Sequence, residues 1–111
     1  MSISTHVLDA VVGAPAAGMA IRLEQVDGPH PTEIGRGVTN ADGRCPDLTD
    51  GLELGTGVYQ LHFDTGAFFA RTGTPTLYPE VRLVFEVTDA SAHYHVPLLL
   101  SPFAFSTYRG S

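Results

Sequence analysis

Short apolar segments separated by glycine and proline are the feature that most restricts how this chain can fold. Its 111 residues include 12 glycines and 8 prolines, which leave few stretches long enough for an ordinary helix. Within these segments apolar and polar residues alternate, as they do in strands that bury one face. Residues 80–88 show the pattern most clearly, and there Val81, Leu83 and Phe85 are predicted to face the core. The sequence therefore favours an all-β fold.

About eight short strands and one helix are expected. A turn with glycine at its last position, Asn40–Gly43, separates two of the strands. The predicted helix is Asp64–Gly73, which is short and ends at glycine. The predicted strands cover residues 3–9, 19–26, 33–39, 57–64, 80–88, 92–100 and 103–109, and a further short strand begins at Arg44. This order predicts one domain over residues 1–111, folded as a two-sheet β-sandwich.

Charge and composition argue against several classes of partner and location. A formal net charge of −6 argues against binding to nucleic acid or to an anionic membrane surface. No apolar stretch approaches the roughly 18 residues of a membrane-spanning helix, and the N-terminus lacks the pattern of a signal peptide. The single cysteine, Cys45, cannot form an intrachain disulfide and is consistent with a reducing compartment. We therefore expect a soluble cytoplasmic protein.

The end of the chain is the first candidate for a functional site. Terminal residues usually fray, but residues 98–107 are too apolar and aromatic to form a solvated tail. A strand that packs up to the last residues would hold Tyr108, Arg109, Gly110 and Ser111 in a fixed place. All six basic residues are arginines, whose planar guanidinium groups suit flat anionic ligands. The ending thus offers a guanidinium group, a hydroxyl group and a terminal carboxylate to one site.

Two segments at opposite ends of the chain resemble the transthyretin-like family. They are residues 6–16, HVLDAVVGAPA, and residues 94–103, YHVPLLLSPF. The intervening strands fit the same order, so the resemblance covers essentially the whole chain. It implies a transthyretin-like β-sandwich. Two branches of that family have to be distinguished, the thyroid-hormone carriers and the 5-hydroxyisourate hydrolases.

At four places the chain resembles the hydrolase branch. The carriers have lysine in place of His6, glutamate in place of Arg44 and threonine in place of His95, and they lack the Tyr-Arg-Gly-Ser ending. The resemblance therefore implies that water opens the ring of 5-hydroxyisourate, giving 2-oxo-4-hydroxy-4-carboxy-5-ureidoimidazoline in urate degradation. It implies no cofactor. It also implies a homotetramer with a channel between two dimers, lined by the face that carries His95 and Leu99.

The chemistry of ring opening suggests a role for each matching residue. His6 and His95 are the candidate bases, since a pKa of roughly 6.5 leaves much of an imidazole neutral near pH 7. The sequence does not say which of the two takes the proton. Arg44 and Arg109 are predicted to hold ring oxygens of the substrate and to stabilise developing negative charge. Ser111 is predicted to act through its hydroxyl group or through the terminal carboxylate.

Several alternatives stay open at this point. Tyr108 either lines the substrate site or packs against the fold. Ser111 could be the nucleophile of a Ser-His pair, although no G-x-S-x-G elbow is present and activated water is the better hypothesis. His93 lies on the same strand face as His95 and, with His6, could form a three-histidine zinc site. A ligand carrier without catalysis is the remaining alternative, and it would need a deep apolar channel.

Overall fold

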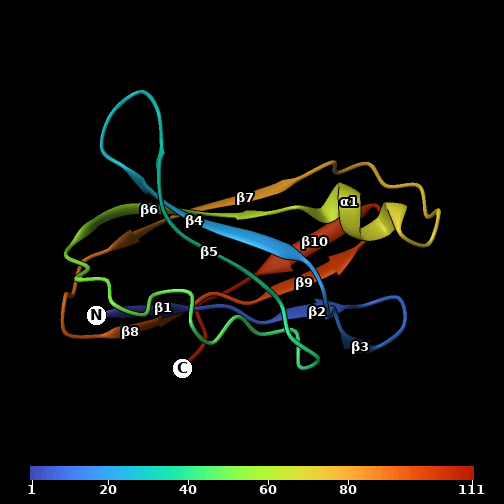
Figure 1. Ribbon diagram of the computed structural model, residues 1–111, viewed down its shortest axis with the longest axis horizontal. Coiled ribbons are helices and arrows are strands. Elements are labelled where there is room, and N and C mark those ends of the chain that lie inside the picture. The colour runs from blue at the N-terminus through green and yellow to red at the C-terminus, as the bar shows by residue number, and fades with distance from the viewer.

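Two β layers pack face to face in the computed structural model, which describes residues 1–111 (Figure 1). The first layer is an antiparallel sheet of, in order, β5 (Thr32–Val38), β4 (Ala20–Val26), β6 (Gly57–Phe63) and β7 (Val81–Val87). The second layer joins a four-stranded sheet of β10 (Ala104–Thr107), β9 (Leu98–Ser101), β2 (Val7–Asp9) and β3 (Ala14–Pro15) to a two-stranded sheet of β1 (Ser2–Ser4) and β8 (His93–His95). The predicted all-β sandwich is confirmed.

The two sheets of the second layer form one continuous surface. The backbone N–H groups of Val96 and Leu98 donate to the carbonyl oxygens of Ser4 and His6, each over 2.9 Å, and so carry the pairing across the gaps between strands. The strands predicted over residues 3–9 and 92–100 are each divided into two in the structure. Pro97 lies at the second division, where it has no N–H group to give to a neighbouring strand.

The strand count differs from the prediction for three reasons. The two divisions add two strands, and β3 pairs with β2 inside a segment predicted as a loop. No strand begins at Arg44, which makes only an isolated bridge with His6. Pro46 follows two residues later and cannot donate a hydrogen bond, so the pairing does not extend. The structure therefore has ten short strands where about eight are predicted.

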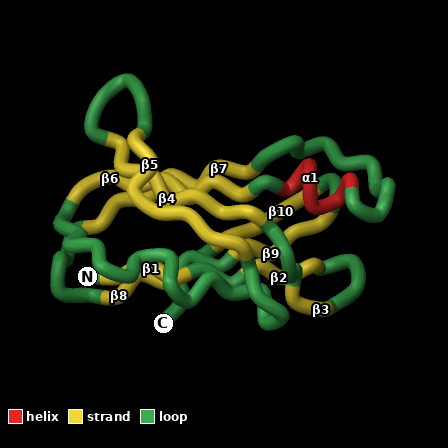
Figure 2. Tube along the Cα trace, viewed as in Figure 1, coloured by secondary structure: helices red, strands yellow, loops and turns green.

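The helix α1 (Thr65–Ala70) follows β6 at one end of the sandwich (Figure 2) and is shorter than predicted. Beyond it, Gly73 adopts a left-handed φ of +63°. The backbone N–H group of Thr74 returns to the carbonyl oxygen of Phe69, a group that the end of the helix leaves free. No helix in the structure has the length and apolar character needed to cross a membrane.

One hydrophobic core fills the space between the layers. The predicted alternation is confirmed in both of them, since Ile3 and Val7 of the second layer and Leu23 of the first are almost fully buried. Phe85 is a partial exception. It is predicted to face the core but is only partly buried in the edge strand β7, where its ring stacks on Tyr59 at a centroid distance of 6.3 Å.

Candidate functional site

The predicted turn that begins at Asn40 places Arg44 beside His6. The N–H group of Gly43 donates to the Asn40 carbonyl at 2.9 Å, and the Asn40 side-chain oxygen accepts the N–H group of Arg44 at 3.1 Å. The turn is fixed to the second layer by the N–H group of Val7, which donates to the Gly43 carbonyl at 2.8 Å. Gly43 has a φ of +74°, and a Cβ atom there would lie 2.3 Å from the Val7 carbonyl oxygen. Only glycine fits this position.

His6 and Arg44 point to the same side of the second layer. They form an isolated antiparallel bridge, and residues opposite each other in such a bridge share a face. The side chain of Arg44 is exposed, and its guanidinium group belongs to none of the ion pairs of the structure. The ring of His6 is half-buried. Both side chains are thus placed to contact a ligand.

The strand β8 brings His95 to the same face. β1 and β8 run parallel with Ser4 opposite His95, and His6 follows Ser4 by two residues. Because side chains alternate along a strand, Tyr94 points into the core while the histidines on either side of it point outward. We refer to this surface, which carries His6, Arg44, His93 and His95, as the histidine face.

The chain end is tied to His95. The N–H group of Gly110 donates to the His95 carbonyl at 2.7 Å, in an isolated antiparallel bridge. A Cβ atom on Gly110 would lie 2.5 Å from Cδ2 of the His95 ring. The glycine of the ending therefore lets the backbone pass directly against the imidazole. Ser111 lies one residue beyond this contact and is exposed.

The side chains of Arg109 and Tyr108 lie outside the histidine face. The guanidinium carbon of Arg109 is 4.2 Å from the centre of the Tyr94 ring, a cation–π contact, and Nη2 approaches the His93 carbonyl at 3.5 Å. Both side chains line a groove of about 460 Å³ between β7 and the chain end. Arg109 precedes Gly110 directly and points away from the face that Gly110 shares with His95. The structure thus gathers His6, Arg44 and His95 on one face and places these two side chains in the groove.

Burial and neighbouring cations lower the pKa of His95. Desolvation is the largest cause, followed by the charges of Arg44, His93 and His6, while a hydrogen bond to the Ser4 backbone acts in the opposite direction. None of the four ion pairs of the structure includes a residue of the histidine face. The neutral imidazole of His95 is therefore favoured near pH 7.

Sequence reasoning missed a row of hydroxyl groups on this face. The two ring nitrogens of His93 pair with the hydroxyl groups of Ser2 and Ser4, and Ser4 Oγ also lies 2.7 Å from Nδ1 of His95. The available signal was the two-residue spacing of Ser2, Ser4 and His6. No group of three His, Cys, Asp or Glu side chains is arranged to hold a metal ion, the three histidines included.

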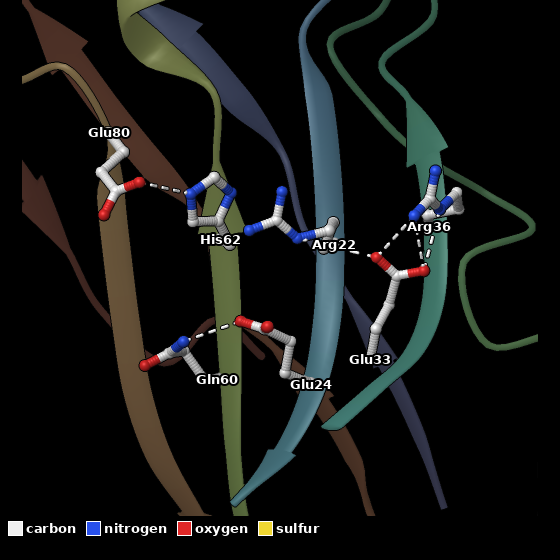
Figure 3. Close-up of polar contacts among 7 residues, drawn as sticks. All are labelled: Arg22, Glu24, Glu33, Arg36, Gln60, His62 and Glu80. Atoms are coloured by element: carbon white, nitrogen blue, oxygen red, sulfur yellow. Dashed lines mark hydrogen bonds and ion pairs between the residues drawn. The ribbon is translucent and has the colours of Figure 1, made fainter. Parts of the chain in front are cut away.

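A second group of histidine and arginine side chains lies on the outer face of the first layer (Figure 3). His62 is buried, and its Nε2 lies 2.9 Å from the carboxylate of Glu80, which also pairs with Arg82 at 2.7 Å. Arg36 donates two hydrogen bonds to Glu33, at 2.9 and 2.8 Å. Each of these side chains already has a carboxylate partner within the fold, so this group offers little to a ligand.

Comparisons with known proteins show the family to which the chain belongs. Residues 3–110 match the model of the HIUase/Transthyretin family. A 5-hydroxyisourate hydrolase of Mus musculus is 42% identical over 111 residues, which cover 98% of this chain and 94% of the mouse protein. The structure of Klebsiella pneumoniae 5-hydroxyisourate hydrolase has a TM-score of 0.86 and 37% identity, with 98% of each chain covered. Sea bream transthyretin, crystallised in complex with thyroxine, has a TM-score of 0.90 and 32% identity over 97% of this chain and 93% of that one. The chain is a member of the HIUase/Transthyretin family.

Proposed function

We propose that this protein is a 5-hydroxyisourate hydrolase of the cytoplasm that works without a cofactor. Water opens the ring of the substrate and gives 2-oxo-4-hydroxy-4-carboxy-5-ureidoimidazoline. The observation that carries the proposal is the histidine face, where imidazole rings and a guanidinium group share one surface and none of these side chains belongs to an ion pair. Relatives with this activity in their names resemble the chain over almost its full length.

His95 is the proposed base. Because its pKa is lowered, its ring is neutral near pH 7 and can take a proton from water. The water oxygen attacks the amide-like carbonyl carbon, the ring C–N bond breaks, and the proton returns to the leaving nitrogen. General acid–base catalysis of this kind typically contributes ~10²–10⁴-fold to the rate. Activated water also explains why no serine nucleophile is needed.

Arg44 is the proposed group that stabilises negative charge. Its guanidinium group has no partner within the chain and offers several N–H donors to the carbonyl oxygen as that oxygen becomes negative. His6 lies directly across the bridge from Arg44. We assign its ring to a hydrogen bond with a polar group of the substrate, which leaves proton transfer to His95.

The chain end contributes to substrate binding in this proposal. Ser111 follows the contact between Gly110 and the His95 ring, so its hydroxyl group or the terminal carboxylate can reach a substrate on the histidine face. Arg109 and Tyr108 stay predicted substrate contacts. Their side chains line the groove on the other side, so a direct contact requires the guanidinium group of Arg109 to leave the Tyr94 ring or the substrate to extend around the chain end.

A homotetramer is the second part of the proposal. His6, Arg44 and His95 line none of the cavities of the single chain, so a substrate on the histidine face would be open to water. A second copy packed over this face would exclude water and strengthen the electrostatic contacts. We propose a dimer of dimers in which each mouth of the central channel combines residues of two subunits. Sedimentation tests this, and a fully active monomer at low concentration would contradict it.

The overall fold does not separate a hydrolase from a ligand carrier. The TM-score to the bacterial hydrolase is 0.86 and that to the thyroxine-bound transthyretin is 0.90, which are similar values. The difference lies in the side chains. An apolar channel would suit a carrier, whereas the histidine face presents polar and cationic groups that suit the hydrolysis of a flat polar ring.

The test generates 5-hydroxyisourate in place from urate with urate oxidase and follows its decay by ultraviolet absorbance. We expect the native protein to accelerate the decay and His95→Ala to lose that acceleration. His30→Ala is the matched control, because His30 lies in an exposed loop between β4 and β5. A folded native protein that leaves the spontaneous rate unchanged would contradict the hydrolase and favour a carrier.

A further inference from the structure

Four hydrogen-bonded side chains form a row that ends at His95, two from β1 and two from β8. The Ser2 hydroxyl group pairs with Nδ1 of His93, while Nε2 of His93 lies 2.7 Å from Ser4 Oγ. Ser4 Oγ in turn lies 2.7 Å from Nδ1 of His95. The parallel register of the two strands holds the row together, because it sets Ser2 opposite His93 and Ser4 opposite His95. The row begins at Ser2, passes through the exposed ring of His93 and ends at the half-buried ring of His95.

Three proton arrangements keep every hydrogen bond of this row while both imidazoles are neutral. A neutral imidazole donates from one nitrogen and accepts at the other, and a hydroxyl group donates one hydrogen. In the first arrangement Nδ1 of His95 donates to Ser4, and Ser4 donates to Nε2 of His93. In the second arrangement every hydrogen bond is reversed, so Ser4 donates to Nδ1 of His95. In a third arrangement Nε2 of His93 and Nδ1 of His95 both donate to Ser4 Oγ, and the Ser4 hydrogen points out of the row. The first and third arrangements place the proton of His95 on Nδ1, whereas the second places it on Nε2.

We propose that Ser4 and His93 are positioning residues that keep the proton of His95 on Nδ1 and so leave its Nε2 atom as the base. The inference rests on the proposed hydrolase activity. In the first arrangement Nε2 of His95 has a free lone pair that can take a proton from water. The positive charge that follows is stabilised, since Nδ1 continues to donate to Ser4. In the second arrangement Nε2 already carries a hydrogen and cannot act as a base.

The chemical nature of the partners supports the first arrangement. Ser4 Oγ lies 2.7 Å from Nδ1 of His95, whereas Nε2 of that ring has no hydrogen-bond partner within the chain, so Nε2 is the nitrogen left open to water. The groups that surround the ring are Arg44, His6 and His93, with no carboxylate among those that shift its pKa. A carboxylate in the place of Ser4 would orient the ring but would also raise its pKa. A hydroxyl group orients the ring while leaving it neutral.

The experiment compares the native protein with Ser4→Ala, Ser4→Thr and His93→Ala, and uses His30→Ala as the control. Each is assayed for kcat and KM, and long-range ¹H–¹⁵N spectra of the histidine rings report which nitrogen of His95 carries the proton. We expect Ser4→Ala to lower kcat about tenfold with little change in KM, as one lost hydrogen bond would. Ser4→Thr keeps the hydroxyl group on a strand-compatible side chain and should restore kcat. His93→Ala should have a smaller effect, because Ser4 can still accept from His95.

The spectra separate this inference from the proposed function. A native protein with His95 protonated at Nε2 overturns the inference, whether or not the protein hydrolyses 5-hydroxyisourate. Unchanged kcat in Ser4→Ala also overturns it. An inactive native protein whose His95 proton lies on Nδ1, and moves in Ser4→Ala, refutes the hydrolase but supports the positioning of the ring. If Ser4→Ala does not fold, the native spectrum and the kcat of Ser4→Thr and His93→Ala decide the question.

Discussion

The two groups of histidine and arginine side chains, one on each layer, differ in whether the fold supplies their counter-charge. On the first layer His62 has Glu80 within 2.9 Å and Arg36 has both oxygens of Glu33 (Figure 3). These contacts also affect the carboxylate, because hydrogen bonds from His62 and Arg82 lower the pKa of Glu80. On the histidine face no side chain takes part in an ion pair.

This difference is more informative than the residue types, which are the same in both groups. A paired cation is already satisfied and gains little from a ligand, whereas an unpaired one gains a full charge-assisted hydrogen bond when a polar substrate arrives. The chain is acidic overall, with a net charge of −6, so carboxylates were available to neutralise the histidine face as well. None of them forms an ion pair with a residue of this face, so its imidazole and guanidinium groups stay available to a ligand.

Removing one histidine from each group should give the largest difference in kcat/KM between the two groups. His95→Ala should lower kcat/KM by ~10²–10⁴-fold, because it removes the proposed base. His62→Ala should leave kcat/KM nearly unchanged but lower the melting temperature, because it removes a buried ring and the partner of Glu80. Steady-state kinetics and calorimetry of both variants check the prediction. Loss of activity in His62→Ala with the fold intact would contradict the assignment of the site.

The next expected difference comes from the arginines. Arg44→Gln should lower kcat/KM by about 10²-fold, the typical cost of losing a donor to a developing oxyanion. Arg36→Gln is the matched control on the first layer, since it removes an exposed ion pair with Glu33 that contributes little. Arg44→Lys keeps the charge but loses the planar fork and should fall between native and Arg44→Gln. Equal activity of Arg44→Gln and Arg36→Gln would rule out the proposed role of Arg44.

A smaller loss is expected from the chain end. Gly110→Ala would place a Cβ atom 2.5 Å from Cδ2 of His95, so either the ring or the last residues must shift. We expect kcat/KM to fall about tenfold, since a displaced base loses alignment with water. Gly28→Ala is the control, because no atom lies within 4 Å of a Cβ at that position. Matching kinetics for these two variants would show that the ring position does not depend on the chain end.

Much of the fold could be predicted from the sequence because it depends on local alternation. The inward positions of Ile3, Val7 and Leu23 follow from a period of two, and the turn before Arg44 follows from its asparagine and glycine. The divided strands could not be predicted in the same way. The buried positions Tyr94, Val96 and Leu98 keep a spacing of two across Pro97, and only the missing N–H group of that proline shows where the pairing stops.

The candidate site was harder to predict because it depends on pairing between distant segments. The contact of Ser4 with His95 joins residues 91 positions apart, and the parallel register that creates it has no local signal in the sequence. The position of the Arg109 side chain also depends on pairing between distant segments. Its place in the sequence next to Gly110 suggests a position beside His95, but the bridge of Gly110 with His95 turns the guanidinium group toward Tyr94. Its predicted role in substrate binding stays a prediction.

The smallest expected effect is a shift of the pH profile, and it sharpens the comparison of the two layers. If neutral His95 is the base, kcat/KM falls as the pH drops through its pKa, and burial and Arg44 place that pKa below the ordinary value of about 6.5. Arg44→Gln removes one of these causes, so the acid limb of its residual activity should move to higher pH. Arg36→Gln should not change the pH of the acid limb of the activity profile.

The paired group on the first layer should respond to acid differently. The pKa of Glu80 is lowered, so its ionised form contributes stability above its ordinary pKa, and this stability is lost as the pH falls through the lowered value. Acid should therefore reduce activity through protonation of His95 and weaken the fold through protonation of Glu80, in an order set by the two lowered pKa values. Melting temperatures and kcat/KM measured over the same pH range check the order. Parallel loss of both would show that a single acid-sensitive transition of the whole fold, and not the titration of His95, sets the acid limb.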